Sequence, residues 1–370
     1  PDGYYFPTHS NSENPTAGTP SIMQLFKTTT SSFSWQLSGF TLIYLLALSG
    51  CGEKDAPLSA DNNNTSRLVV AMLPKLKNIA YFDACHQGAK QAAKELDIEL
   101  IYDGPNEPSG SEQNKFMETW IRQGVDAICV APNQPLAIKR IVQRAQERGI
   151  KILTWDSDAP ESGRLFMVNQ VDDTRLGQLL MDDLAEQMNQ SGQWAVVIAS
   201  LDASNLNSWR RVAEARAKEQ YPDMELVDTI VTREDENVAR QKVETLLNKY
   251  PDLKGMIAFD SNSVPGAAEA ILRSGKTGQV ALTGNTTPGK MGPYLDQGVL
   301  KSFYLWDPRK LGDLTIRTAV AAVNGKDLKP GTELSGFGPL KFSSEDPTMI
   351  ILSDPIRFTI DNISEYDWGF

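Results

Sequence analysis

The apolar period changes twice within residues 68–102, LVVAMLPKLKNIAYFDACHQGAKQAAKELDIELIY. Leu68–Leu73 is a continuous apolar run, which is typical of a strand buried on both faces. Between Ala89 and Leu96 apolar residues recur at i, i+3, i+4 and i+7, the spacing of one helix face. Glu99–Tyr102 reads as a second strand. The passage therefore predicts a strand–helix–strand unit with its two strands parallel in one sheet.

The same alternation continues along the chain. Further strands are predicted at Ala127–Ala131, Ile150–Trp155, Leu165–Asn169, Trp194–Ser200, Leu226–Val231, Met256–Asp260, Val280–Thr283 and Ser302–Trp306. Helices are predicted between them, including Ser111–Gln123, Leu176–Met188 and Val238–Leu247, and Gly124 is expected to end the first of these. This order predicts an α/β fold of two Rossmann-like lobes with parallel sheets. Ligands of such sheets bind beyond the carboxyl ends of the strands.

The composition narrows the classes of function. The 370 residues carry a formal net charge of −11, which opposes binding to nucleic acid and to anionic lipid. The two histidines and three cysteines have no spacing typical of a zinc site or a disulfide framework. No glycine-rich phosphate loop and no Ser-His-Asp set is apparent, so we expect no cofactor, no metal and no catalysis. Neutral small molecules remain as the expected partners.

The N-terminal part is expected to lie outside the fold. Residues 1–22 have no apolar period and are interpreted as a non-native extension before a start at Met23. Residues 23–50 contain an apolar run too short for a permanent membrane span, which is typical of a signal peptide. The run ends in Leu-Ser-Gly-Cys, which resembles a bacterial lipobox and implies lipidation of Cys51. Residues 51–66 then read as a polar tether. The alternative is a chance cysteine after a buried helix.

Polar and aromatic residues follow the predicted strands. They are Lys75, Tyr81, Phe82, Asp156, Ser157, Asn205, Trp209, Asp260, Trp306 and Asp307, and the apolar Pro265 follows Asp260. Carboxylates, amides and an ammonium can hydrogen-bond hydroxyl groups in fixed directions, and aromatic planes suit the apolar faces of a sugar ring. The set therefore predicts a site for a sugar.

Five of these residues also have a structural interpretation. Tyr81 and Phe82 can be core aromatics at the start of a helix. Asp156 can cap the segment that follows it. Trp209 can pack between the lobes, and Lys75 can be a solvated surface lysine.

The chain resembles the type I periplasmic binding proteins, most closely the autoinducer-2-binding and rhamnose-binding subfamily. The resemblance runs from Leu68 to the C-terminus and rests on Leu73-Pro74-Lys75-Leu76, Tyr102-Asp103-Gly104-Pro105, Leu153-Thr154-Trp155-Asp156-Ser157-Asp158, Leu305-Trp306-Asp307 and Asn362-Ile363 with Tyr366-Asp367. It implies two lobes, residues 67–168 with 307–340 and 169–306 with 341–370. Three crossings are then expected near Asn169, Asp307 and residue 341. Carried over by position, the autoinducer-2 site corresponds to Lys75, Asp156, Pro265 and Ala267, and ribose-binding relatives add Tyr81 and Phe82.

One departure from the subfamily bears on the ligand. Where the autoinducer-2 proteins have an Asp-Gln pair ahead of a tryptophan, this chain has Asn205 and Leu206 ahead of Trp209. A carboxylate and an amide are thereby replaced by an amide and an alkyl chain, and a hydrogen bond that involves a charge is worth roughly 1.5–3 kcal/mol. A hexose, deoxyhexose or pentose is therefore expected instead of autoinducer-2.

The resulting prediction is a monomeric, periplasmic, lipid-anchored protein that delivers a sugar to the membrane permease of an ABC importer. Its contact with the membrane is expected through the lipid on Cys51 alone. A sensor that presents its ligand to a membrane receptor uses the same closing lobes and stays an alternative. A sugar-responsive repressor needs an N-terminal helix-turn-helix where this chain has a signal sequence and tether. An enzyme on a Rossmann-like scaffold needs a nucleophile, a metal cluster or a cofactor loop, and none of these is apparent in the sequence.

Overall fold

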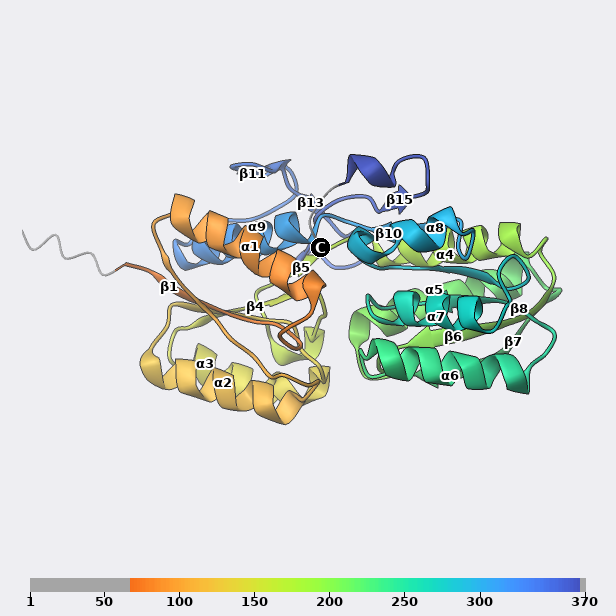
Figure 1. The fold of residues 1–370 in the computed structure, drawn as a ribbon. Helices are drawn as coiled ribbons and strands as arrows, with labels where there is room; N and C mark the ends of the chain where they lie inside the picture. Colours follow the sequence, from red (N-terminus) through yellow and green to blue (C-terminus); the bar gives the residue numbers. More distant parts are fainter. Residues whose placement is uncertain (1–66, 367–370) are drawn as a thin grey trace, which may run out of the picture. The chain divides into compact units, whose positions relative to one another are not determined.

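The computed structural model describes residues 67–366 (Figure 1). The predicted extension, signal peptide, tether and lipidation at Cys51 lie outside the described residues. Among the described helices, none combines the length and the apolar character needed to cross a bilayer. The predicted fold class is confirmed, because two separate parallel sheets alternate with helices along the chain.

The first lobe is built on a seven-stranded sheet in the order β13-β14-β5-β4-β3-β1-β2. Its parallel strands are β1 (Val69–Leu73), β2 (Glu99–Tyr102), β3 (Ala127–Val130), β4 (Lys151–Trp155) and β5 (Phe166–Asn169), with β14 (Met349–Ile351) parallel to β5. Helices α1 (Ala80–Glu95) and α9 (Pro308–Val323) cover one face, and α2 (Gly110–Gln123) and α3 (Lys139–Gln146) cover the other (Figure 1). As predicted, Gly124 ends α2, in the left-handed conformation that glycine adopts without steric cost.

The second lobe is built on a four-stranded parallel sheet in the order β7-β6-β8-β9. The strands are β6 (Gly192–Ile198), β7 (Met224–Val231), β8 (Leu253–Ala258) and β9 (Ala281–Gly284). The helices are α4 (Asp173–Gln187), α5 (Ser204–Gln220), α6 (Glu236–Lys249), α7 (Ser263–Arg273) and α8 (Gly292–Asp296). Helix α4 packs on α5, and α6 packs on α7.

Short strands complete the structure. Strand β10 (Phe303–Leu305) pairs antiparallel with β15 (Ile356–Phe358), and β11 (Glu333–Leu334) pairs with β12 (Gly338–Pro339). Each strand predicted from the sequence overlaps an observed one, whereas β11 to β15 were not predicted. Two or three residues are too few to show an apolar period.

The third crossing differs from its predicted position. Strands β13 (Lys341–Phe342) and β14 form a hairpin on the edge of the seven-stranded sheet, because β14 pairs with β5. Residues 341–351 therefore belong to the first lobe, and the prediction that the second lobe resumes at residue 341 was wrong. The chain crosses between Ile351 and Ile356, where β15 pairs with β10 of the second lobe.

Helices α1 and α9 approach each other unusually closely. A Cβ atom on Gly312 would lie 1.8 Å from the carbonyl oxygen of Cys85, and one on Gly88 would lie 1.8 Å from that of Arg309. Backbone atoms cannot rotate away from such a contact, so each helix needs a glycine where it meets the other. Helix α1 begins after the loop that follows β1, and α9 begins at the second crossing. The close packing of the two helices therefore fixes the distance between this loop and the crossing.

We predict that Gly312→Ala lowers the free energy of unfolding by about 1–3 kcal/mol, because the added methyl group separates α1 from α9. Chemical denaturation measures the difference. Gly292→Ala is the matched control, since a Cβ there meets no atom within 4 Å. Equal stability of both variants and the wild type would show that the two helices can part without cost.

Candidate functional site

A tight turn at the end of β4 positions Asp156. The residue has φ +61°, a left-handed conformation that Asp and Asn tolerate better than most side chains. Ser157 N donates to Trp155 O at 2.6 Å, and Ser157 Oγ donates to Pro132 O at 2.8 Å. The Ser157 hydroxyl, predicted to contact ligand, is thus engaged with the backbone beside β3. Its role in this structure is to hold the turn.

The Lys75 ammonium contacts both lobes. Its Nζ lies 2.8 Å from Asp156 Oδ2, off the direction of a hydrogen bond, and donates to Asn205 Oδ1 at 3.0 Å. Asn205 lies in the first turn of α5, whereas Lys75 and Asp156 follow β1 and β4. All three residues are buried, with Lys75 only 4% exposed, so the interpretation of Lys75 as a solvated surface lysine was wrong.

Two aromatic residues extend this polar network. Tyr81 OH donates to Asp156 Oδ1 at 2.9 Å, and Trp306 Nε1 donates to Tyr81 OH at 3.1 Å. Burial, followed by the charge of Asp156, raises the pKa of the Tyr81 phenol well above its usual range. The phenol therefore stays a donor to Asp156. No backbone group of the described residues bonds the Asp156 carboxylate, so its interpretation as a cap was wrong.

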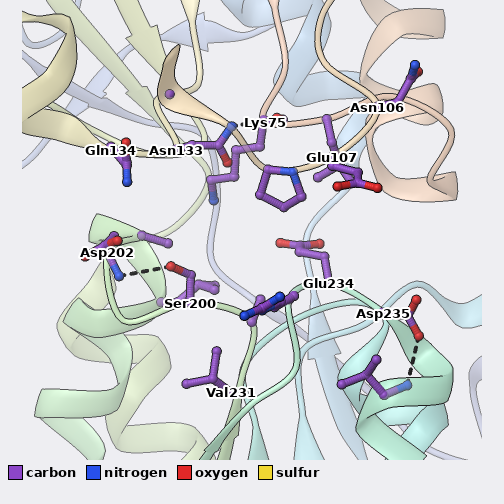
Figure 2. Close-up of a pocket in the computed structure, with 18 residues that line it drawn as sticks. Lys75, Asn106, Glu107, Asn133, Gln134, Ser200, Asp202, Val231, Glu234 and Asp235 are labelled. Carbon is purple, nitrogen blue, oxygen red and sulfur yellow. Dashed lines mark hydrogen bonds between the residues drawn. The ribbon is translucent and has the colours of Figure 1, made fainter. Parts of the chain in front are cut away.

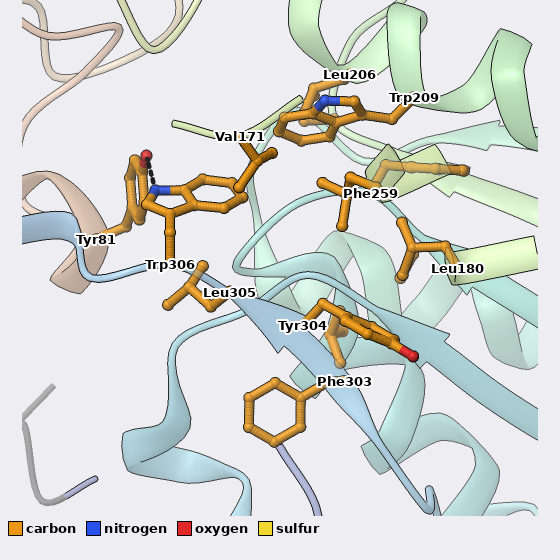
Figure 3. Packing of buried hydrophobic residues seen from close by; sticks show 14 of the residues in the cluster. Tyr81, Val171, Leu180, Leu206, Trp209, Phe259, Phe303, Tyr304, Leu305 and Trp306 are labelled. Carbon is orange, nitrogen blue, oxygen red and sulfur yellow. Dashed lines mark hydrogen bonds between the residues drawn. The ribbon is translucent and has the colours of Figure 1, made fainter. Parts of the chain in front are cut away.

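The predicted aromatic residues pack on one another. Trp209 and Trp306 have ring centroids 5.7 Å apart (Figure 3). Phe82 meets Trp155 edge to face, with ring centroids 5.6 Å apart. Trp209 Nε1 donates to Asp173 Oδ1 at 2.9 Å. Tyr81 and these tryptophans are at most 5% exposed. Their contact with a ligand stays a prediction. In this structure they pack on one another beside the polar network.

Asp158 and Asp307 have local partners. Asp158 pairs through both oxygens with Arg164, at 2.6 and 2.7 Å, and Arg164 Nη2 also lies 2.7 Å from Asp346 Oδ2 in the β13–β14 loop. Asp158 N donates to Ser204 Oγ of the second lobe at 2.8 Å. Asp307, a predicted ligand contact, caps α9 by accepting from Arg309 N at 3.0 Å.

The strand ends of the second lobe hold polar atoms without partners. Asp260 follows β8, and its Oδ1 accepts from Ser263 N at 2.9 Å, while no donor among the described residues reaches its Oδ2. Asn285 follows β9, and its Oδ1 also lacks a described partner. Both residues are buried. Buried acceptors left without donors cost free energy, and they are therefore candidates for contact with a ligand or with water.

Pro265 and Ala267 lie on α7. Ala267 is fully buried, so its side chain faces the interior in this structure. Pro265 lines a cavity of about 300 Å³ together with Asn78 and Ile79 of the first lobe and Glu234 of the second.

The largest of the described cavities, about 590 Å³, lies between the lobes (Figure 2). The first lobe contributes Lys75, Leu76, Asn106, Glu107, Pro108, Gly110, Asn133 and Gln134, and the second contributes Ala199, Ser200, Asp202, Ala203, Leu206, Val231, Arg233, Glu234, Asp235 and Val238. Lys75 is the predicted site residue that lines it. Leu206, which the sequence comparison placed at a ligand contact, also faces this space. No aromatic ring of the described residues lines the cavity.

Three polar groups at this cavity were not predicted from the sequence. Asn133 and Gln134 follow β3, and Glu234 follows β7. Asn133 Nδ2 donates to Lys75 O at 2.7 Å and so holds the lysine backbone. All three come after a predicted strand, so the rule that found Asp156 could have found them.

The carboxylates of Glu234 and Asp260 influence each other. Burial and then the charge of Asp260 raise the pKa of Glu234, whereas Lys75 opposes this rise. Burial likewise raises the pKa of Asp260, against the lowering effect of its hydrogen bonds from Ser263. Lys75 lowers the pKa of both carboxylates, and its Nζ lies 2.8 Å from Asp156 Oδ2.

Comparisons with known proteins agree with this architecture. The family model described as a periplasmic binding protein domain matches residues 70–327. The chain is 27% identical to the xylitol-binding protein of Mycolicibacterium smegmatis over 63% of this chain and 64% of that protein, so the match spans just under two thirds of that relative. It is 24% identical to the D-ribose/D-allose-binding protein of Pseudomonas aeruginosa, over 70% of this chain and 82% of that protein.

Two solved structures superpose on most of the chain. LsrB from Clostridium saccharobutylicum in complex with AI-2 has a TM-score of 0.76 at 26% identity, covering 81% of this chain and 100% of its own. An ABC transporter solute binding protein from Clostridium phytofermentas with bound L-rhamnose has a TM-score of 0.77 at 26% identity, covering 82% and 99%. The resemblance stated from the sequence motifs is thereby confirmed.

We predict that Asp156→Asn lowers the free energy of unfolding by about 3–5 kcal/mol, because it leaves the buried Lys75 ammonium without its ion-pair partner. Asparagine tolerates the positive φ, so the backbone adds little to the loss. Asp97→Asn is the matched control: Asp97 also has a positive φ and pairs with Arg67 at 2.9 Å, but its side chain is 90% exposed. Exposed pairs contribute about 0–1 kcal/mol. Similar losses in the two variants, measured by urea denaturation, would contradict this account.

Proposed function

The chain belongs to the periplasmic binding protein family, and on that premise we propose that it captures a monosaccharide or sugar-like polyol between its lobes and delivers it to an ABC importer. The observation that carries the proposal is the buried network of Lys75, Asp156 and Asn205, which joins the two lobes at the carboxyl ends of their strands. Ligands of open parallel sheets bind at this edge.

The chemistry of the site supports a polyhydroxylated ligand. Each sugar hydroxyl can donate one hydrogen bond and accept others. The cavity offers the ammonium of Lys75 and the amides of Asn133 and Gln134 as donors, and carboxylates as acceptors. Relatives named for xylitol, ribose, allose and rhamnose point to the same class of ligand.

The residue that departs from the autoinducer-2 proteins supports a ligand other than autoinducer-2. Leu206 lines the cavity and can offer only an apolar contact there. Within the proposed function we therefore favour a hexose, deoxyhexose or pentose. We also propose that the protein acts as a monomer in the periplasm, anchored through a lipid on Cys51.

A thermal-shift screen tests the function. We expect at least one hexose, deoxyhexose, pentose or pentitol to raise the melting temperature of the purified protein by about 5 °C when present at a hundredfold excess over its dissociation constant. A ligand that binds the folded state alone stabilises it by about 2.7 kcal/mol at that concentration. A hit should be weakened in the Asp156→Asn variant. Absence of a shift with every member of the panel would refute the proposal.

The lipid anchor gives a separate prediction. Wild-type protein should sediment with membranes, whereas Cys51→Ser should be recovered in the soluble fraction, because one thioether-linked diacyl group suffices for firm anchoring. Mass spectrometry of the N-terminal peptide locates the lipid. Soluble wild-type protein that is uncut before Cys51 would rule out this anchor and leave the sugar-binding proposal intact.

A further inference from the structure

Two hydrogen bonds hold the first turn of α5, in the second lobe, against the first lobe. Lys75 Nζ donates to Asn205 Oδ1 at 3.0 Å, and Asp158 N donates to Ser204 Oγ at 2.8 Å. Ser204 and Asn205 are the first two residues of the helix. Asn205 belongs to the ligand network already described, whereas Ser204 does not.

Ser204 contacts the opposite lobe and lies apart from the proposed ligand site. It is not among the residues that line the interlobe cavity, although its neighbours Ala203 and Leu206 are. Its hydroxyl oxygen accepts from a backbone amide, and this bond is partly shielded from water. The contact therefore joins lobe to lobe, and a ligand in the cavity is not needed to form it.

The amide that donates to Ser204 is held in place by the carboxylate of its own residue. Asp158 Oδ1 accepts from Thr154 Oγ1 at 2.5 Å and from Ala159 N at 2.7 Å. Its two oxygens also accept from Arg164, at 2.7 and 2.6 Å. A carboxylate with donors on both oxygens has a fixed orientation. The N–H group of the same residue is therefore kept directed at the second lobe.

Arg164 connects this amide with the third crossing between the lobes. Its Nη2 lies 2.7 Å from Asp346 Oδ2, and its Nη1 donates to Thr348 Oγ1. Both partners lie in the β13–β14 loop, and β14 leads directly into the third crossing. The planar guanidinium bonds in fixed directions, so it sets the distance between the Asp158 turn and this loop. The donor to Ser204 is thereby tied to a segment about which the lobes can move.

We propose that Ser204 is a positioning residue for ligand capture, which holds the closed lobes together through Asp158 N, and that Arg164 places the amide for this bond. This role rests on the proposed function and adds residues that act without touching the ligand. The apparent dissociation constant equals the intrinsic one divided by the fraction of molecules in the binding-competent form. Loss of the Ser204 bond lowers the closed fraction and therefore weakens every ligand by the same factor.

Calorimetric titration of Ser204→Ala tests this role, with D-ribose, D-allose, L-rhamnose and xylitol as probes. For each probe that binds, the dissociation constant should rise about threefold to tenfold, which corresponds to one neutral hydrogen bond. The factor should be equal for all of them. Ser204→Thr keeps the acceptor oxygen and should stay within about twofold of the wild type. Ser274→Ala is the matched control, because it removes an exposed hydroxyl at the end of α7.

Arg164→Lys tests the placement of the amide. Lysine keeps the charge but cannot form the bidentate pair with Asp158. The variant should weaken binding in the wild-type background and much less in Ser204→Ala, because the amide then has no acceptor to meet. Equal losses in both backgrounds would remove Arg164 from the assigned role. If Arg164→Lys does not fold, Asp346→Asn takes its place, since it alters only the contact with the β13–β14 loop.

Small-angle scattering without added sugar separates this role from the proposed function. Ser204→Ala should have a larger radius of gyration than the wild type and Ser274→Ala, because fewer molecules are closed. Equal radii, a loss of affinity for one probe alone, or the same loss in Ser204→Thr would overturn the role of Ser204 and leave sugar binding standing. Failure of all four probes to bind would count against the proposed function, and the scattering would still decide whether Ser204 holds the lobes together.

Discussion

The Lys75 ammonium lies 2.8 Å from Asp156 in its own lobe and 3.0 Å from Asn205 in the other, and all three side chains are screened from water. A buried ammonium is tolerated only where opposite charge and acceptors surround it. The position of Lys75 therefore constrains the turn after β4, the start of α5 and the distance between the lobes. Tyr81 and Trp306 continue the same chain of hydrogen bonds into the second crossing.

The supports of this network lie in segments that contribute little to the cavity itself. Ser157 holds the Asp156 turn against the backbone beside β3, and Arg164 ties the next residue, Asp158, to the β13–β14 loop. That loop leads into the third crossing between the lobes. The turn that presents Asp156 is thus anchored to the same hairpin that carries the chain across. A change in the angle between the lobes would affect these contacts of Arg164 as well as the contacts with a ligand.

Both sides of the cleft hold buried acceptors without a described donor, Asp156 Oδ2 in the first lobe and Asp260 Oδ2 in the second. In the first lobe, Asp156, Ser157 and Asp158 each have partners. In the second lobe, Asp260 Oδ2 and Asn285 Oδ1 are buried acceptors without described donors. Burial of unsatisfied acceptors is unfavourable unless a bound molecule or water supplies the donors. These acceptors are therefore the positions at which we expect a ligand or water to donate hydrogen bonds.

The sequence by itself determined the fold class and the strand ends at which the site would lie. Strands buried on both faces need continuous apolar runs, so β1, β3, β4 and β6 could be located without knowledge of their neighbours. The residue that follows each run is then placed at the ligand-binding edge, which singled out Lys75, Asp156 and Asn205. The short strands β13 and β14 were missed, because strands of two or three residues have no period to detect.

Only the tertiary structure decided how the candidate residues divide between ligand and scaffold. Asp156 and Asp158 follow the same strand and look equivalent in sequence, yet Arg164 engages one and Lys75 the other. Lys75 and Asn205 are separated by 130 positions in the chain and still share a hydrogen bond. Local periodicity reports the burial of a single element, whereas the pairing of charges depends on contacts between distant segments that only the packed lobes create.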